Sequence, residues 1–194
     1  KNPCGKYGRN GNVAHCRSLP VVNSLTASMA RTFLCLGSNL GDSRRHLEAA
    51  IELIRQEVGE IVAQSALYQT EPWGFSSENL FINQVIEVET SCSLFRLFRL
   101  IQDIEHRLGR TKNDSVATYS DRIIDIDILA YDDSVINTLE LCVPHPQMEK
   151  RRFVLEPLCD IAPKWIHPVL LKSAHKLLEE CPDNGRVLKI VVKS

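Results

Sequence analysis

The stretch RIIDIDILAYDD, residues 122–133, constrains the fold of this 194-residue chain more than any other segment. Apolar and acidic side chains alternate in it with the two-residue period of a β-strand. Asp125 and Asp127 must therefore project from one face of that strand. The opposite face carries three isoleucines: Ile124, Ile126 and Ile128. Acids are poor strand formers, so their place in the most apolar strand candidate of the chain needs a physical explanation.

The segments before this strand predict both strands and helices. Apolar runs and alternation predict three earlier strands: 32–36, 60–70 and 80–89. Helical spacing of apolar residues predicts one helix from Asp42 or Ser43 to near Gly59, and a second between Ser93 and Gly109. The order β-α-β-β-α-β favours an α+β fold, a ferredoxin-like βαββαβ sandwich with both helices on one face of a mostly antiparallel sheet.

Residues 1–31 are predicted to be a leader outside the folded domain, which we place at 32–194. The leader has no acidic residue, since the first one in the chain is Asp42. It could be a transit peptide, a disordered tail, or sequence upstream of a start at Met29. A C-terminal extension should add a helical turn region, a helix and a last strand: 147–159, 171–181 and 187–192.

Composition excludes several classes of function. The net charge of −1 gives no global attraction for nucleic acid, so anion binding must come from local basic clusters. No apolar run approaches the roughly 18 residues that a membrane span needs. The seven cysteines are scattered without a C-x-x-C pair, which favours reduced thiols over a disulfide framework or a zinc ribbon. We expect a cytoplasmic monomer with no nucleic-acid or membrane partner.

The acidic pair has two interpretations. Asp125 and Asp127 could be solvated acids on an exposed strand face. Alternatively, strand geometry places the two carboxylates about 7 Å apart, where they repel each other unless a cation lies between them. Mg²⁺ is usually held by one or two carboxylates plus substrate phosphates. Nearby basic residues could hold the phosphate oxygens, although each alone could equally be a surface charge: Arg110, Lys112, Arg122, His145, Lys150, Arg151 and Arg152.

Aromatic and amide side chains form a second group. Phe81 and Asn83 are two positions apart in a predicted strand, so they share one face. A ring beside an amide could stack on a flat heterocycle and hydrogen-bond to it, although aromatic residues at such positions are more often part of the core. Trp73 and Phe153 are further aromatic candidates. The turn GSNLG could cradle a phosphate, but it lacks the Walker pattern.

Six motifs, taken together, resemble one enzyme family. They follow one another along the chain: LGSNLGD (36–42), YQTEPWG (68–74), FINQVIEVET (81–90), IEHRLGR (104–110), DRIIDIDILAYDD (121–133) and VPHPQMEKRRFVLEPLCDIAP (143–163). From residue 32 to about 165 the chain is similar to 6-hydroxymethyl-7,8-dihydropterin pyrophosphokinase (HPPK), a folate-pathway family. The resemblance implies transfer of the β,γ-diphosphoryl unit of ATP to the pterin hydroxymethyl group, which leaves AMP. It also implies two Mg²⁺ ions and the ferredoxin-like fold.

The resemblance further implies roles for individual residues. Asp125 and Asp127 would bind both Mg²⁺ ions, and Arg110 and Arg122 would be catalytic-loop arginines. Six residues would form the nucleotide site: Glu105, Arg110, Lys112, Arg122, His145 and Arg151. Five would form the pterin pocket, with the two phenylalanines on either side of the ring and the amide hydrogen-bonded to it: Thr70, Trp73, Phe81, Asn83 and Phe153.

Three departures from the family pattern affect the loop at 110–121 and the nucleotide site. The family often reads R-W-G-P-R before the acids, whereas residues 118–122 here read T-Y-S-D-R, without the Gly-Pro pair. Lys112 stands where a second loop arginine is expected, and lysine cannot form a bidentate fork. Pro146 follows His145 where some members carry an aromatic residue. These departures bear on loop closure and not on the class of reaction.

Two other classes of function have to be weighed. A ferredoxin-like regulatory or RNA-binding module would need exposed aromatics and a positive sheet face, whereas two acids lie on the strand here. An ordinary kinase would release ADP instead of AMP, so product analysis distinguishes it.

Overall fold

The computed structural model describes residues 29–110 and 120–191. Most of the predicted leader lies outside the described residues, and so do Lys112 and most of the loop predicted at 110–121. The first strand, β1 (Ala30–Ser38), begins before the domain boundary expected at residue 32. Ala30 pairs with Thr90 of a neighbouring strand, so the end of the predicted leader belongs to the sheet.

One antiparallel sheet of six strands forms the centre of the molecule. Its order is β5-β1-β4-β3-β8, and β2 pairs with β4 on the same edge as β3. Besides β1, the strands are β2 (Glu60–Gln64), β3 (Leu67–Thr70), β4 (Phe81–Thr90), β5 (Asp125–Tyr131) and β8 (Val187–Ile190). A separate two-stranded sheet joins β6 (Ile136–Asn137) to β7 (Cys142–Val143). The chain is therefore a mixed helix-and-sheet protein with an antiparallel sheet.

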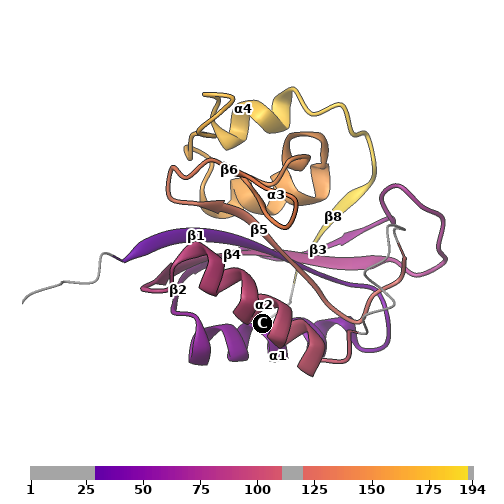
Figure 1. Ribbon diagram of the computed structural model, residues 1–194. Coiled ribbons are helices and arrows are strands. Elements are labelled where there is room, and N and C mark those ends of the chain that lie inside the picture. The colour runs from indigo at the N-terminus through magenta and orange to yellow at the C-terminus, as the bar shows by residue number, and fades with distance from the viewer. Residues whose placement is uncertain (1–28, 111–119, 192–194) are drawn as a thin grey trace, which may run out of the picture.

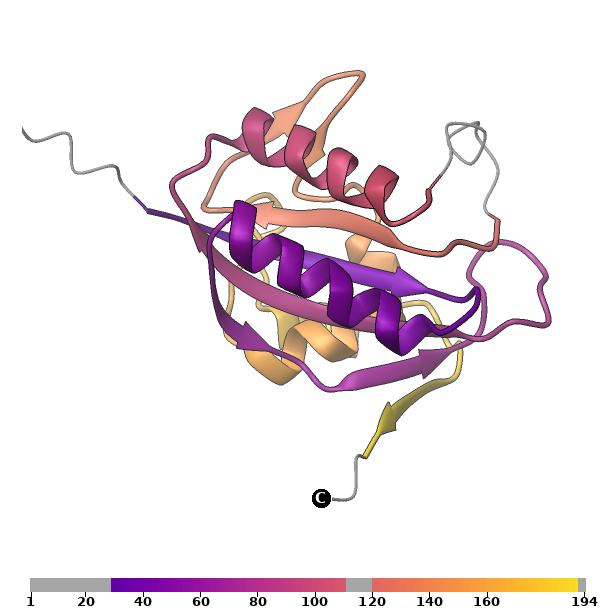
Figure 2. The same cartoon turned by 90° about the horizontal axis from the view of Figure 1, so that it is seen from below.

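Helices cover both faces of this sheet. The described residues include α1 (Ser43–Glu57), α2 (Leu94–Arg107), the short 3-10 helix η2 (Met148–Lys150), α3 (Arg152–Ile161) and α4 (Ala174–Glu179). Figure 1 shows α1 and α2 below the sheet and α3 and α4 above it, and Figure 2 shows α1 and α2 running across the lower face. No helix in the described part of the chain is both long and apolar enough to cross a membrane.

Each face of the sheet has its own apolar core. The core on the α1/α2 side includes Leu34 and Leu36 of β1, both fully buried. It also contains the three isoleucines of the acidic strand, as the alternation predicts: Ile124, Ile126 and Ile128. The core on the α3/α4 side includes Phe33 and Cys35 of β1 and Leu129 of β5. Two-residue alternation thus divides β1 between two different environments.

Local interactions explain where several elements begin and end. Asp42 caps α1, because its side chain accepts a hydrogen bond from the backbone N–H of Arg45 at 3.1 Å. The strand predicted at 60–70 is interrupted at Ser65, whose Oγ accepts from the backbone N–H of Val85 and takes part in the ladder itself. The helix predicted from residue 171 begins only at Ala174, because Leu171 has a φ of 53°, outside the helical region.

Candidate active site

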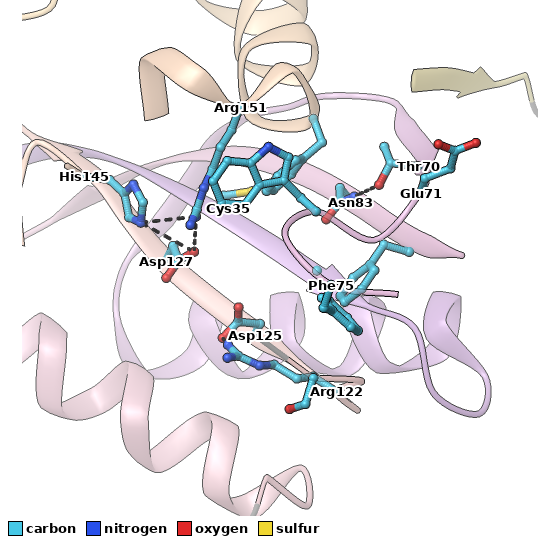
Figure 3. Close-up of a pocket in the computed structure, with 15 residues that line it drawn as sticks. Cys35, Thr70, Glu71, Phe75, Asn83, Arg122, Asp125, Asp127, His145 and Arg151 are labelled. Atoms are coloured by element: carbon cyan, nitrogen blue, oxygen red, sulfur yellow. Dashed lines mark hydrogen bonds and ion pairs between the residues drawn. The ribbon is translucent and has the colours of Figure 1, made fainter. Parts of the chain in front are cut away.

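A cavity of about 190 Å³ lies on the α3 side of the sheet. Its floor comes from β1 and its neighbours, where Cys35 of β1 pairs with Asp127 of the edge strand β5 and Gly37 pairs with Asp125. Gly37 also pairs with Asn83 of β4 on its other side. Figure 3 shows the acids and the basic side chains at one end of the cavity and the polar pair of Thr70 and Asn83 at the other.

The first end of the cavity is charged. Asp125 Oδ1 accepts a hydrogen bond from Arg122 Nη1 at 2.6 Å and lies 3.0 Å from Arg110 Nη1. Asp127 Oδ2 lies 3.9 Å from Arg151 Nη1 and 4.0 Å from His145 Nε2. The two acids thus share one face, as predicted, and each lies within 4 Å of an arginine.

Burial and charge shift the acid–base properties at this end. The pKa of Asp127 is raised, first by burial and then by the negative charge of Asp125. Burial, and then the positive charge of Arg151, lowers the pKa of His145 to about 4, so its imidazole is neutral at neutral pH. The backbone N–H of Gln147 donates to Nδ1 of His145 at 3.3 Å, and Nε2 faces both Asp127 Oδ2 and Arg151 Nη1.

Glu105, near the end of α2, supports the charged end from the side. Its carboxylate accepts a hydrogen bond from the backbone N–H of Ile126 at 2.7 Å and pairs with Arg110. Burial, with the charge of Asp125 adding to it, raises the pKa of Glu105 to about 7, although Arg110 opposes the shift. A second hollow of about 270 Å³ adjoins this group, and Glu105, Asp127 and His145 all line it.

The second end of the cavity is aromatic and carries one amide side chain, that of Asn83. Asn83, 3% exposed, donates through Nδ2 to Thr70 Oγ1 at 2.7 Å. Phe81 also lines this end of the cavity. The rings of Phe75 and Phe81 are packed edge-to-face, with 6.2 Å between their centroids. Flat rings and a fixed amide are suited to an aromatic heterocycle with hydrogen-bonding edges.

Arg151 connects the two ends. Its guanidinium lies 4.7 Å from the ring centroid of Trp73 and 5.7 Å from that of Phe153. The same guanidinium faces Asp127 and contacts His145, with 3.4 Å between Nη1 and Nε2. Any ligand that fills both ends of the cavity must pass this side chain.

The structure brings most of the predicted site residues together. Ten of them line the cavity: Thr70, Trp73, Phe81, Asn83, Arg122, Asp125, Asp127, His145, Arg151 and Phe153. Glu105 and Arg110 do not line it but contact the acidic strand from the α2 side. Lys112 lies outside the described residues.

Sequence reasoning gives no site role to four residues of the cavity wall: Cys35, Glu71, Phe75 and Ser120. A fifth, Gly37, is considered only as the start of the GSNLG turn and not as part of this cavity. Phe75 could have been found, since it follows Trp73 in a loop already assigned to the pocket. Cys35 and Gly37 could not, because their position depends on the register between β1 and β5.

Comparison with known proteins identifies the family. The family model of 7,8-dihydro-6-hydroxymethylpterin-pyrophosphokinase (HPPK) matches residues 33–163. The chain belongs to the HPPK family. Among curated HPPK relatives, the 2-amino-4-hydroxy-6-hydroxymethyldihydropteridine pyrophosphokinase of Porphyromonas gingivalis is 45% identical over 143 residues, covering 72% of this chain and 95% of that protein. The Bacillus subtilis enzyme of the same name is 39% identical over 130 residues, covering 66% and 76%.

Longer proteins contain HPPK-like segments as well. The folic acid synthesis protein fol1 of Schizosaccharomyces pombe is 33% identical over 154 residues, which is 79% of this chain but 21% of that protein. The crystal structure of Plasmodium falciparum HPPK-DHPS matches with a TM-score of 0.64 at 17% identity, over 78% of this chain and 44% of that one. The chain therefore spans less than half of that longer protein, and the likeness shows the fold alone.

Proposed function

We propose that the chain is a 2-amino-4-hydroxy-6-hydroxymethyldihydropteridine diphosphokinase. It transfers the diphosphoryl group of ATP to 6-hydroxymethyl-7,8-dihydropterin and releases AMP and the pterin diphosphate, a step in folate biosynthesis. One observation carries the proposal: in a chain of the HPPK family, a single cavity joins an aromatic and amide end to an end with paired acids and arginines.

The aromatic end suits the pterin. Its ring would lie between Phe81 and Phe153, with Trp73 at the border. Asn83 is held by Thr70, so its free oxygen is oriented in advance and can accept from the pterin N–H groups. A flat, donor-rich ring buried in this way loses little conformational entropy.

The charged end suits the phosphates of ATP. Arg122 and Arg151 line the cavity, and Arg110 reaches the same acids from the side. When phosphates bind, these guanidinium groups can hold phosphate oxygens in the forked geometry that arginine favours. Neutral His145 carries one ring N–H, which can donate to an oxygen of the same group when Nε2 holds the proton. The adjoining hollow beside Glu105 gives room for the rest of the nucleotide.

The donor set fits Mg²⁺ bound together with phosphate. Asp125 and Asp127 place two carboxylates on one face, and the described residues contain no cluster of three His, Cys, Asp or Glu side chains that would hold a metal alone. Mg²⁺ is commonly bound by one or two carboxylates, with phosphate oxygens and water completing its shell. We propose that these two acids hold two Mg²⁺ ions, which would neutralise charge that develops on the transferred group.

The main contribution of the protein to this reaction would be to align the two substrates. The pterin hydroxyl must meet the β-phosphorus in line with the leaving AMP, and no covalent enzyme intermediate is needed. The fixed ring site and the arginines supply this alignment from opposite ends of the cavity. An acid that already binds a metal is a poor base, so the site residues contribute orientation and charge more than proton abstraction.

The same proposal extends to the fold and the setting of the protein. The strand order β5-β1-β4 followed by β2 and β3, with α1 and α2 on one face, supports a ferredoxin-like assignment. The five cysteines in the described part of the chain are free, which is in keeping with a cytoplasmic protein. We also propose that it works as a monomer on small-molecule substrates.

Nucleotide product analysis tests the proposed function. The chain is incubated with ATP, Mg²⁺ and 6-hydroxymethyl-7,8-dihydropterin, and AMP is separated from ADP. We expect AMP that depends on both the pterin and Mg²⁺, with chelation of the metal abolishing it. ADP as the product would identify an ordinary kinase, and a folded protein that makes neither nucleotide would refute the proposal.

A further inference from the structure

Asp121 joins two segments at the edge of the cavity. Its Oδ1 accepts a hydrogen bond from Asn39 Nδ2 at 2.6 Å, and its Oδ2 accepts from Asn79 Nδ2 at 2.9 Å. Asn79 lies near the end of the loop that carries Trp73 and Phe75, both of which line the aromatic end. One carboxylate therefore links the β1–α1 turn to the loop that carries the aromatic wall, beside a longer direct contact of 3.4 Å from Asn39 Nδ2 to the carbonyl of Asn79.

Asn39 passes this connection on to Arg122. Its backbone N–H donates to the carbonyl of Arg122 at 3.0 Å, and its Oδ1 accepts from the backbone N–H of Arg122 at 2.7 Å. Asn39 is 5% exposed, so these bonds are shielded from water. They continue the pairing of β1 with β5 beyond Asp125, whose carboxylate the Arg122 side chain contacts at 2.6 Å.

We propose that Asp121 is a positioning residue that couples the aromatic wall of the cavity to Arg122. The inference rests on the proposed function, because it concerns how the pterin end and the phosphate end are kept in register.

The electrostatics of Asp121 agree with this role. A hydrogen bond from Ser77 lowers the pKa of Asp121 most; burial opposes it, and the hydrogen bonds from Asn79 and Asn39 lower the pKa further. The carboxylate is therefore ionised at neutral pH and accepts from both amides at once.

A double-mutant cycle tests the coupling. We expect Asp121→Ala and Asn79→Ala each to lower kcat/KM for the pterin by roughly tenfold, since small misplacements of aligned groups slow a reaction strongly. Because the two residues act as one unit, the double variant should lie within about twofold of the weaker single variant. Glu78→Ala removes an exposed acid from the same loop and is the matched control, with activity within about twofold of the wild type.

Two kinetic results would overturn the inference: wild-type activity in Asp121→Ala, or losses that multiply to about a hundredfold in the double variant. If Asp121→Ala does not fold, Asp121→Asn replaces it, because the amide keeps one of the two acceptor oxygens and should retain intermediate activity. If Asp121→Asn loses no more activity than the control Glu78→Ala, the inference is overturned as well.

Amide hydrogen exchange of the ligand-free protein separates this inference from the proposed function. In Asp121→Ala the backbone amides of Asn79 and Arg122 should both exchange at least about fivefold faster than in the wild type, while Glu78→Ala leaves them unchanged. If the wild type makes no AMP, the proposed function fails, and the exchange rates still decide the coupling. Unchanged exchange at either amide would overturn it.

Discussion

The two faces of the central sheet are made by the same strands, yet their residues have different tasks. On the α1/α2 face, Leu34 and Leu36 of β1 are fully buried in an apolar core. On the other face Cys35 and Gly37, one position along in each case, form the floor of the cavity beside the acids of β5. The comparison shows that adjacent positions of one strand can serve stability and binding separately, because side chains alternate between faces.

Asp127→Ala should show the largest effect and act on the cavity face alone. Loss of several kcal/mol of charge stabilisation corresponds to a fall in kcat on the order of a thousandfold. The ligand-free protein should not lose stability, because the pKa of Asp127 is raised by burial and by its neighbour Asp125, which shows that its charge is unfavourable there. AMP formation measures kcat, and the melting temperature measures stability.

Asp133→Ala, which removes an exposed acid just beyond β5, is the control for Asp127→Ala. A kcat within tenfold of the wild type would remove Asp127 from the metal site.

Leu34→Ala should have the opposite kind of effect. Truncation of a fully buried leucine typically destabilises a protein by about 2–5 kcal/mol, and Leu34 is 0% exposed. Under conditions in which the variant is folded, kcat should equal that of the wild type, because no cavity atom is removed. Urea unfolding and AMP formation check the two statements. A fall in kcat with little loss of stability would show that the two faces are not separate.

Gly37→Ala should act on substrate binding from the floor of the cavity. An added Cβ would lie 2.8 Å from Asn83 Oδ1, so the amide that also donates to Thr70 Oγ1 must shift. We expect KM for the pterin to rise by up to about tenfold, the value of one hydrogen bond, with a smaller change in kcat. In an Asn83→Ala background the clash is absent, so the same substitution should add little. An equal rise in KM in both backgrounds would contradict this account.

Glu105→Gln should have the smallest effect, and it should depend on pH. The folded protein keeps the proton on Glu105 up to a pKa of about 7, above the ordinary value of 4.5. The contribution of this carboxyl to stability is therefore fully present below about pH 4.5 and is lost as pH rises through 7. Between about pH 6 and 8 the Gln variant should gain about 1 kcal/mol of unfolding free energy relative to the wild type. Urea unfolding across this range measures it, and parallel pH curves for the two proteins would exclude the shift.

The sequence predicts those parts of the site that depend on local periodicity. Asp125 and Asp127 share a face because they are two positions apart in a strand, and the same holds for Phe81 and Asn83. The buried isoleucines follow from the same alternation. For such residues the strand pattern alone fixes the direction of the side chain.

Other parts depend on contacts between distant segments. Asn39 and Asp121 are 82 positions apart, and nothing in either motif predicts that they bind each other. Glu105 reaches β5 through the backbone of Ile126, a contact set by the packing of α2 on the sheet. The break at Ser65 depends on its bond to Val85 in β4. Register and helix packing, which arise only in the folded chain, decide these features.

The pairing of arginines with acids at the cavity also bears on how fast a nucleotide can arrive. Among the described residues, three arginines contact three carboxylates there: Arg110, Arg122 and Arg151 with Glu105, Asp125 and Asp127. Burial raises the pKa of Glu105 to about 7 and also raises that of Asp127, so at neutral pH these acids offset the arginines only in part. The positive charge that remains attracts an anionic ligand within the Debye length of about 8 Å at physiological ionic strength. Its association rate should therefore fall as salt is added, and the fall should be steeper at a pH below 7, where more of the acid is protonated.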